Sequence, residues 1–131
     1  MNEENRRRLI SAIITLFVSL IGTGILFVVL LVHNVTLAQA DIDAAKNVMK
    51  NVYWAICPLS NRFIHNALPP VELMRRNGLA ICLGTDSLSS NDDLDMVAEL
   101  TCLHSEFPEV PFAELLAWAS LNGARFLGKE A

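Results

Sequence analysis

Apolar residues occur along this chain in two patterns. Short runs are apolar throughout, as at residues 52–56 and 79–83, whereas other stretches carry apolar residues at helical spacing. Strands are expected at residues 25–32, 52–56 and 79–83, and helices at residues 39–50, 69–76, 92–107 and 111–127. Short buried strands that alternate with helices predict a parallel α/β structure. In the helix over 92–107 we expect a cap at Asp92 or Asp93 and an apolar face of Leu94, Val97, Leu100 and Leu103.

The first 32 residues leave two interpretations open. Arg6-Arg7-Arg8 precedes an uncharged stretch from Leu9 to Val32, and this length with a basic flank predicts a transmembrane helix over residues 9–32. Gly22-Thr23-Gly24 interrupts the stretch, however. The alternative is a buried apolar helix before these glycines and a buried strand after them.

Composition narrows the class of protein. A chain of 131 residues with a net charge of -4 is expected to form one domain without a basic face, which argues against nucleic acid as a partner. The three cysteines show no C-x-x-C spacing, so we expect reduced, buried thiols and a cytoplasmic location. Membrane anchoring through residues 9–32 is the alternative location.

Polar residues that could take part in catalysis or metal binding follow each expected strand. His33 comes after the first strand, Ser60 and Asn61 after the second, and Asp86 after the third. In a parallel barrel, catalytic residues collect at this end of the strands. An aspartate there is suited to binding a metal ion or moving a proton.

Four segments with these residues resemble the metal-dependent amidohydrolase superfamily, on its deaminase and chlorohydrolase-like side. Residues 30–34 (LLVHN) resemble the sixth barrel strand with its histidine, and residues 57–61 (CPLSN) resemble the loop after the seventh. Residues 83–87 (LGTDS) resemble the eighth strand with its aspartate, and residues 119–128 (ASLNGARFLG) resemble a helix of the family. The resemblance covers residues 25–131 and leaves residues 1–24 as a separate, unmatched segment.

The resemblance implies a (β/α)8 TIM-type barrel and hydrolysis of a non-peptide C–N bond in a small-molecule substrate. Family members activate water with one or two divalent metal ions, commonly zinc or iron. By the resemblance, Asp86 binds the metal and relays a proton. His33 orients the water in mononuclear deaminases or ligates a second metal in binuclear relatives, and Ser60 and Asn61 shape the substrate site.

The sequence also departs from the family. The H-x-H pair, the fifth-strand histidine and the acid/base glutamate are absent, and we expect His65 in a loop and His104 on a helix surface. The expected protein is therefore a truncated, inactive part of the barrel, its last three strand–helix units, preceded by an apolar N-terminal helix. Open barrel edges favour self-association. A small membrane-anchored, non-enzymatic protein with a decayed hydrolase segment is the alternative.

Overall fold

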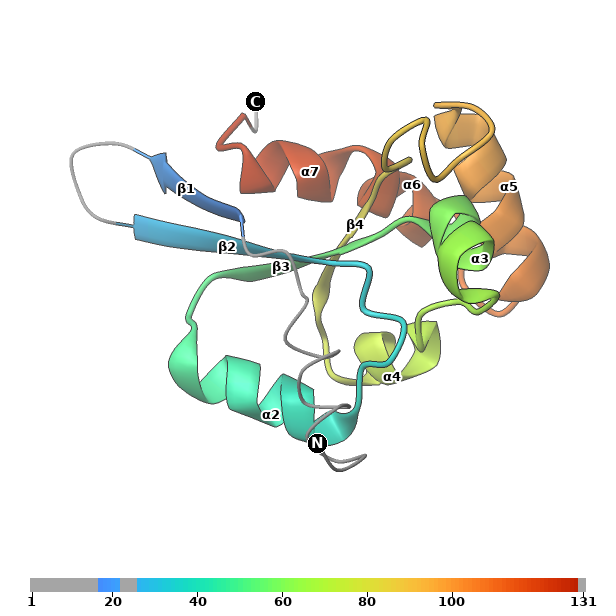
Figure 1. Ribbon diagram of the computed structural model, residues 1–131. Helices are drawn as coiled ribbons and strands as arrows, with labels where there is room; N and C mark the ends of the chain where they lie inside the picture. Colours follow the sequence, from blue (N-terminus) through green and yellow to red (C-terminus); the bar gives the residue numbers. More distant parts are fainter. Residues whose placement is uncertain (1–16, 22–25, 130–131) are drawn as a thin grey trace.

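The core of the fold is a four-stranded sheet. The computed structural model describes residues 17–21 and 26–129 (Figure 1). The strands are β1 (Phe17–Ile21), β2 (Leu26–Val32), β3 (Val52–Ile56) and β4 (Ala80–Leu83), and they lie side by side in this order. Strands β2, β3 and β4 pair in parallel, so that Leu31, Trp54 and Ile81 stand in one row. The predicted parallel α/β structure is confirmed.

Strand β1 differs from the predicted N-terminal helix. It pairs antiparallel with β2, from Phe17 opposite Leu30 to Ile21 opposite Leu26. The helix is therefore wrong for residues 17–21, because this segment satisfies its backbone groups along β2. The predicted transmembrane helix over residues 9–32 is likewise wrong where the structure describes it, because β1 and β2 lie within this stretch. The other residues of the stretch lie outside the described range. No helix in the described part of the chain is long and apolar enough to cross a bilayer.

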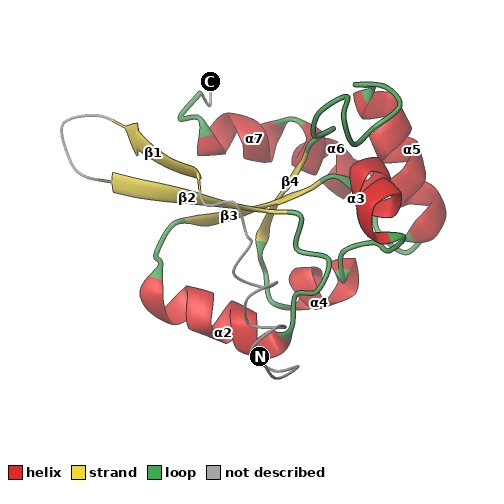
Figure 2. Ribbon diagram, in the orientation of Figure 1, coloured by secondary structure: helices red, strands yellow, loops and turns green. Residues whose placement is uncertain are grey.

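Six helices surround the sheet in the part of the chain that the structure describes (Figure 2). They are α2 (Gln39–Val48), α3 (Pro58–His65), α4 (Val71–Arg76), α5 (Met96–Glu106), α6 (Phe112–Ala119) and α7 (Leu121–Phe126). Helices α2 and α4 lie on one side of the sheet and α7 on the other, where Phe126 packs edge-on against Tyr53 (Figure 1).

Two helices differ from the predicted ones. Helix α3 replaces the expected loop after β3, because Pro58 at its first position is pre-shaped for a helix and not only for a turn. The single helix expected over 111–127 is divided at Ser120, whose ψ of -74° and φ of -137° fall outside the helical region.

The buried core lies between the sheet and the helices. Ile56, Met74, Ile81 and Leu103 are each at most 1% exposed. On α5 the buried residues are Glu99, Cys102 and Leu103, whereas the predicted face includes Leu94 and Val97, which are 51% and 68% exposed. Leu94 is exposed because it precedes the helix, which Asp95 caps.

Candidate active site

The carboxyl ends of the three parallel strands carry the polar side chains that the sequence singles out. His33 directly follows β2, Ser60 and Asn61 lie at the start of α3 after β3, and Asp86 lies in the loop after β4. Parallel pairing brings these three strand ends to one edge of the sheet. The structure therefore brings all four residues together.

The backbone at this edge is held in an uncommon conformation. His33, Asn34 and Asp86 have positive φ angles of 71°, 36° and 60°. A left-handed conformation costs an L-residue roughly 1–2 kcal/mol, and less for Asn and Asp. The side chain of Asn34 supports the turn, because its Nδ2 donates to the carbonyl oxygens of Leu31 and Ala55, both at 3.1 Å. These bonds join the ends of β2 and β3 and set the direction in which His33 leaves the sheet.

The Asp86 carboxylate is the centre of a hydrogen-bond network. The hydroxyls of Ser60 and Ser90 each lie 2.8 Å from its Oδ2, and Nε2 of His33 lies 3.5 Å from the same oxygen. Partial burial raises the pKa of Asp86, but the two hydroxyl hydrogen bonds and the neighbouring His33 lower it by more, so the pKa falls below its usual value. The carboxylate is thus ionised at neutral pH and able to accept a proton.

Asn61 determines which nitrogen of His33 carries the proton. Asn61 has no exposed surface, and its Oδ1 accepts a hydrogen bond from the backbone N–H of Cys57 at 3.2 Å. This orientation directs its Nδ2 at Nδ1 of His33, also at 3.2 Å. An amide nitrogen only donates, so Nδ1 accepts, and the network assigns the proton of the neutral ring to Nε2. This Nε2–H faces the Asp86 carboxylate.

The remaining histidines lie apart from this network, whereas Cys57 takes part in it through its backbone N–H. His65 is exposed at the end of α3, not in the predicted loop, and His104 is exposed on α5, as predicted. Cys57, Cys82 and Cys102 are buried and free of disulfides, as predicted. Burial, with the charges of Asp86 and Glu99, raises the pKa of Cys57 to about 12, so its thiol is not a nucleophile at neutral pH.

Two residues of the network have no role in the sequence-based prediction. Ser90 contributes the second hydroxyl to Asp86, and Glu99 accepts hydrogen bonds from the loops after β3 and β4. The sequence could not single out Ser90, because Ser87, Ser89 and Ser90 all lie in the loop beside Asp86. For Glu99, a signal exists, because this charged residue lies three and four residues before the apolar Cys102 and Leu103 on one helix face.

The described residues fit only part of a metal site. Asp86 offers a carboxylate, whereas the nitrogen of His33 that faces it carries a proton in the assigned tautomer. In residues 17–21 and 26–129, no three His, Cys, Asp or Glu side chains are grouped closely enough to hold one ion. A catalytic zinc takes three protein ligands. These residues therefore do not form a complete metal site by themselves, and metal binding by Asp86 and His33 stays a prediction.

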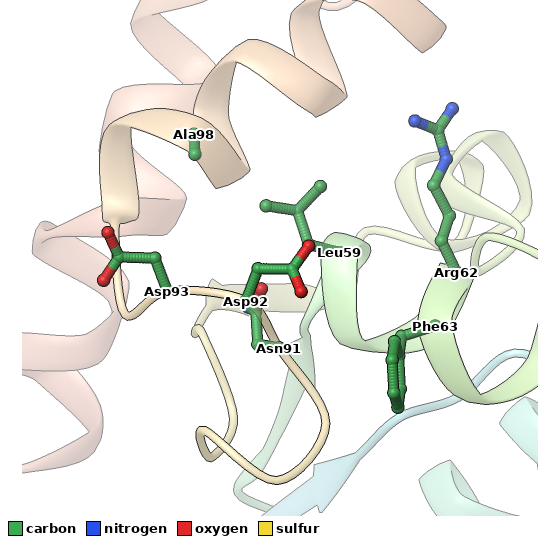
Figure 3. A pocket seen from close by; sticks show the side chains of 7 residues that line it. All are labelled: Leu59, Arg62, Phe63, Asn91, Asp92, Asp93 and Ala98. Atoms are coloured by element: carbon green, nitrogen blue, oxygen red, sulfur yellow. The ribbon is translucent and has the colours of Figure 1, made fainter.

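A cavity of about 420 Å³ lies between α3, α5 and the loop that precedes α5 (Figure 3). Its lining consists of Leu59, Arg62, Phe63, Asn91, Asp92, Asp93 and Ala98. Neither His33 nor Asp86 lines it, so the chemistry is better sought at the strand ends than in this cavity.

Comparison with known proteins identifies relatives of the chain. Residues 15–131 match the model of the amidohydrolase family. A 5-methylthioadenosine/S-adenosylhomocysteine deaminase of Moorella thermoacetica is 38% identical over 109 residues, which cover 78% of this chain and 25% of that protein. A 5'-deoxyadenosine deaminase of Methanosarcina acetivorans is 34% identical, with coverage of 78% and 25%. The chain thus spans about a quarter of the length of these curated relatives.

Solved structures show the same similarity. Helicobacter pylori aminofutalosine deaminase in complex with methylthio-coformycin has a TM-score of 0.65 and 32% identity, over 76% of this chain and 25% of its own. An adenosine deaminase from Xanthomonas campestris with bound zinc has a TM-score of 0.64 and 29% identity, over 76% and 24%. The likeness to these deaminases extends over most of this chain, and the division of the chain after residue 24 stays a prediction.

Proposed function

This chain belongs to the amidohydrolase family, and we propose that it carries the proton-accepting edge of a deaminase-like site. The reaction is hydrolysis of a non-peptide C–N bond, in which water replaces an exocyclic amino group of a purine nucleoside and ammonia leaves. The similarity to deaminases of 5-methylthioadenosine and 5'-deoxyadenosine supports this substrate class.

The observation that carries the proposal is the pairing of Asp86 with His33. The carboxylate oxygen and Nε2 are 3.5 Å apart, and the Asp86 and His33 side chains are 28% and 29% exposed, so both are accessible from solvent. Asp86 accepts a proton from the attacking water as a general base and passes it to the departing amine. The Nε2–H of His33 donates a hydrogen bond to the same water or to the oxygen that develops from it.

The two buried residues of α3 prepare these groups for the reaction. Ser60 keeps the carboxylate ionised by donating to Oδ2, and Asn61 keeps the donor of His33 on the side of Asp86. Of the two roles that the family resemblance leaves open for His33, this tautomer favours orientation of water over metal ligation. Ser60 and Asn61 therefore act through their neighbours in this proposal, and need not contact the substrate.

A divalent metal, zinc or iron, belongs to the proposal by family membership, and a zinc-bound relative supports zinc. Such an ion supplies the lowered pKa of bound water. Asp86 would be one of its ligands. The missing ligands must come from outside the described residues, from this chain or from another. We therefore propose that the purified 131-residue chain binds less than one tightly held zinc per chain.

Self-association is part of the same proposal. Strand β4 ends the sheet, and among the described strands it pairs only with β3. At its outer edge the carbonyl oxygen of Ile81 accepts from Nδ2 of Asn122 at 2.7 Å, and we propose that the rest of this edge pairs with a strand of a second copy. A second copy is also one source of additional metal ligands.

The first experiment records zinc content after dialysis, particle size, and release of ammonia from 5'-methylthioadenosine in one preparation. We expect substoichiometric zinc, oligomers and no turnover. Stoichiometric zinc with turnover in a monomer would contradict the expectation that the site is incomplete.

A chimaera tests the residue roles directly. The matching segment of the Moorella thermoacetica deaminase is replaced by residues 25–131 of this chain, and ammonia release is measured. Relative to the chimaera that keeps Asp86, the Asp86→Asn chimaera is expected to lose at least about a hundredfold in activity, because a general base contributes on this scale. The exposed Asn47→Ala change on α2 is the matched control. A zinc-loaded chimaera that retains full activity with Asn at position 86 would refute the role of Asp86.

A further inference from the structure

Glu99 is a charged residue without any exposed surface. It lies in the first turn of α5, beside the buried residues Cys102 and Leu103. Moving a carboxylate from water into a protein interior is costly unless hydrogen bonds replace its hydration. Burial raises the pKa of Glu99, and its two hydrogen bonds act in the opposite direction. A residue kept at such a cost needs an explanation beyond filling the core.

Both carboxylate oxygens of Glu99 accept a hydrogen bond from another part of the chain. Oε2 accepts from the backbone N–H of Leu59 at 2.9 Å, and Oε1 accepts from Nδ2 of Asn91 at 2.7 Å. Leu59 lies in the first turn of α3, where backbone N–H groups have no partner within the helix and a negative charge is favoured. No Lys, Arg or His forms an ion pair with Glu99 in the part of the chain that the structure describes. Its charge is therefore balanced by hydrogen-bond donors.

These donors are neighbours of the residues that bind Asp86. Leu59 directly precedes Ser60, and Asn91 directly follows Ser90. Asn91 also donates to the carbonyl oxygen of Thr85, the residue before Asp86, at 2.9 Å. The Glu99 side chain thus contacts the residues next to Ser60 and Ser90, the two hydroxyl donors to Asp86.

We infer that Glu99 is a positioning residue for the proposed site, and that its carboxylate holds the loops after β3 and β4 at the separation at which Ser60 and Ser90 both reach Asp86. The inference rests on the proposed role of Asp86. Glutamine cannot replace it, because both partners are donors and the amide group of Gln would turn a third donor toward one of them. Leucine would leave both donors buried without a partner.

Nuclear magnetic resonance of the Glu99→Gln chain at neutral pH tests the inference. We expect hydrogen exchange of the Leu59 amide to accelerate about tenfold, since its acceptor is weakened. We also expect the carboxyl carbon of Asp86 and the ring nitrogens of His33 to shift by more than their line widths. Glu106→Gln is the matched control on the same helix, because Glu106 pairs with Arg62 at the surface. It should leave all three signals unchanged.

The two outcomes separate positioning from simple anchoring of α3. If Leu59 exchanges faster while the signals of Asp86 and His33 stay in place, Glu99 only anchors the helix and the inference is wrong. If Glu99→Gln does not fold, Asn91→Ala decides: it keeps the bond from Leu59 to Glu99 and removes the link to Thr85, so Asp86 should shift while Leu59 stays protected. An unmoved Asp86 signal in that variant would also overturn the inference. Because these signals do not depend on turnover, full activity of the zinc-loaded Asp86→Asn chimaera would count against the proposed function alone.

Discussion

Replacement of Asn61 by alanine is the perturbation that most directly tests how the site is held. The side chain has no exposed surface and makes two hydrogen bonds, from the Cys57 N–H and to Nδ1 of His33. Loss of the first leaves a buried backbone donor without a partner, which costs about 1–3 kcal/mol. The second contributes about 0.5–1.5 kcal/mol, and water replaces part of it because the His33 ring is partly exposed. We therefore expect Asn61→Ala to lower the free energy of unfolding by about 2–3 kcal/mol.

The assay is urea unfolding of the wild type, Asn61→Ala and the exposed control Asn47→Ala, with a two-state fit. A change in Asn61→Ala no larger than the roughly 0.5 kcal/mol expected for the control would refute the two hydrogen bonds. Asn61→Asp tests the tautomer separately, because a carboxylate at this position accepts from both neighbours. The proton of the neutral His33 ring should then move to Nδ1, which the nitrogen spectrum of the ring reports. An unchanged ring spectrum would contradict the assignment of the proton to Nε2 in the wild type.

Three further outcomes follow from the same structure. Ser60→Ala removes one hydroxyl donor from Asp86, so the pKa of Asp86 should rise toward its usual value in a carboxyl-carbon titration, whereas Ser87→Ala should leave it unchanged. Because the folded pKa of Asp86 is lowered, its ionised form stabilises the fold above the unfolded pKa of about 4, and this stabilisation is lost as the pH falls through the folded pKa. The stability difference between wild type and Asp86→Asn should accordingly be smaller at pH 3 than at pH 6 in urea unfolding; a difference independent of pH would contradict the lowered pKa. Leu103→Ala should cost about 2–5 kcal/mol because Leu103 is fully buried, against about 0.5 kcal/mol or less for Val97→Ala on the exposed side of the same helix, and equal losses would contradict this orientation of α5.

The fold could be predicted from local pattern where one pattern dominates. The strand expected at residues 52–56 matches β3 residue for residue, since a short apolar run is bounded by Asn51 and the Cys57-Pro58 pair. Prediction from the pattern fails where the same residues fit two kinds of local structure. Pro58 fits both a turn and the first position of a helix, and the apolar spacing of residues 111–127 continues across Ser120 although the helix does not.

The position of the site could also be predicted, but its internal contacts could not. The rule that polar residues gather at the carboxyl ends of parallel strands places His33, Ser60, Asn61 and Asp86 together. The contact of Asn61 with His33 joins residues 28 positions apart, and that of Glu99 with Leu59 joins residues 40 positions apart. No periodicity in the sequence encodes such pairs, since they depend on how α3 and α5 pack against each other.

The network around Asp86 consists of side chains from the described part of this chain. Ser60, Ser90 and His33 all contact one carboxylate oxygen, and Asn61 and Glu99 hold the elements that carry them. These five residues belong to the described part of one chain, so the ionisation of Asp86 and the tautomer of His33 are properties of that chain. Metal binding depends on additional ligands, whereas the preparation of the base and the hydrogen-bond donor does not. The tautomer and pKa measurements are therefore meaningful on the isolated chain even if it never turns over a substrate.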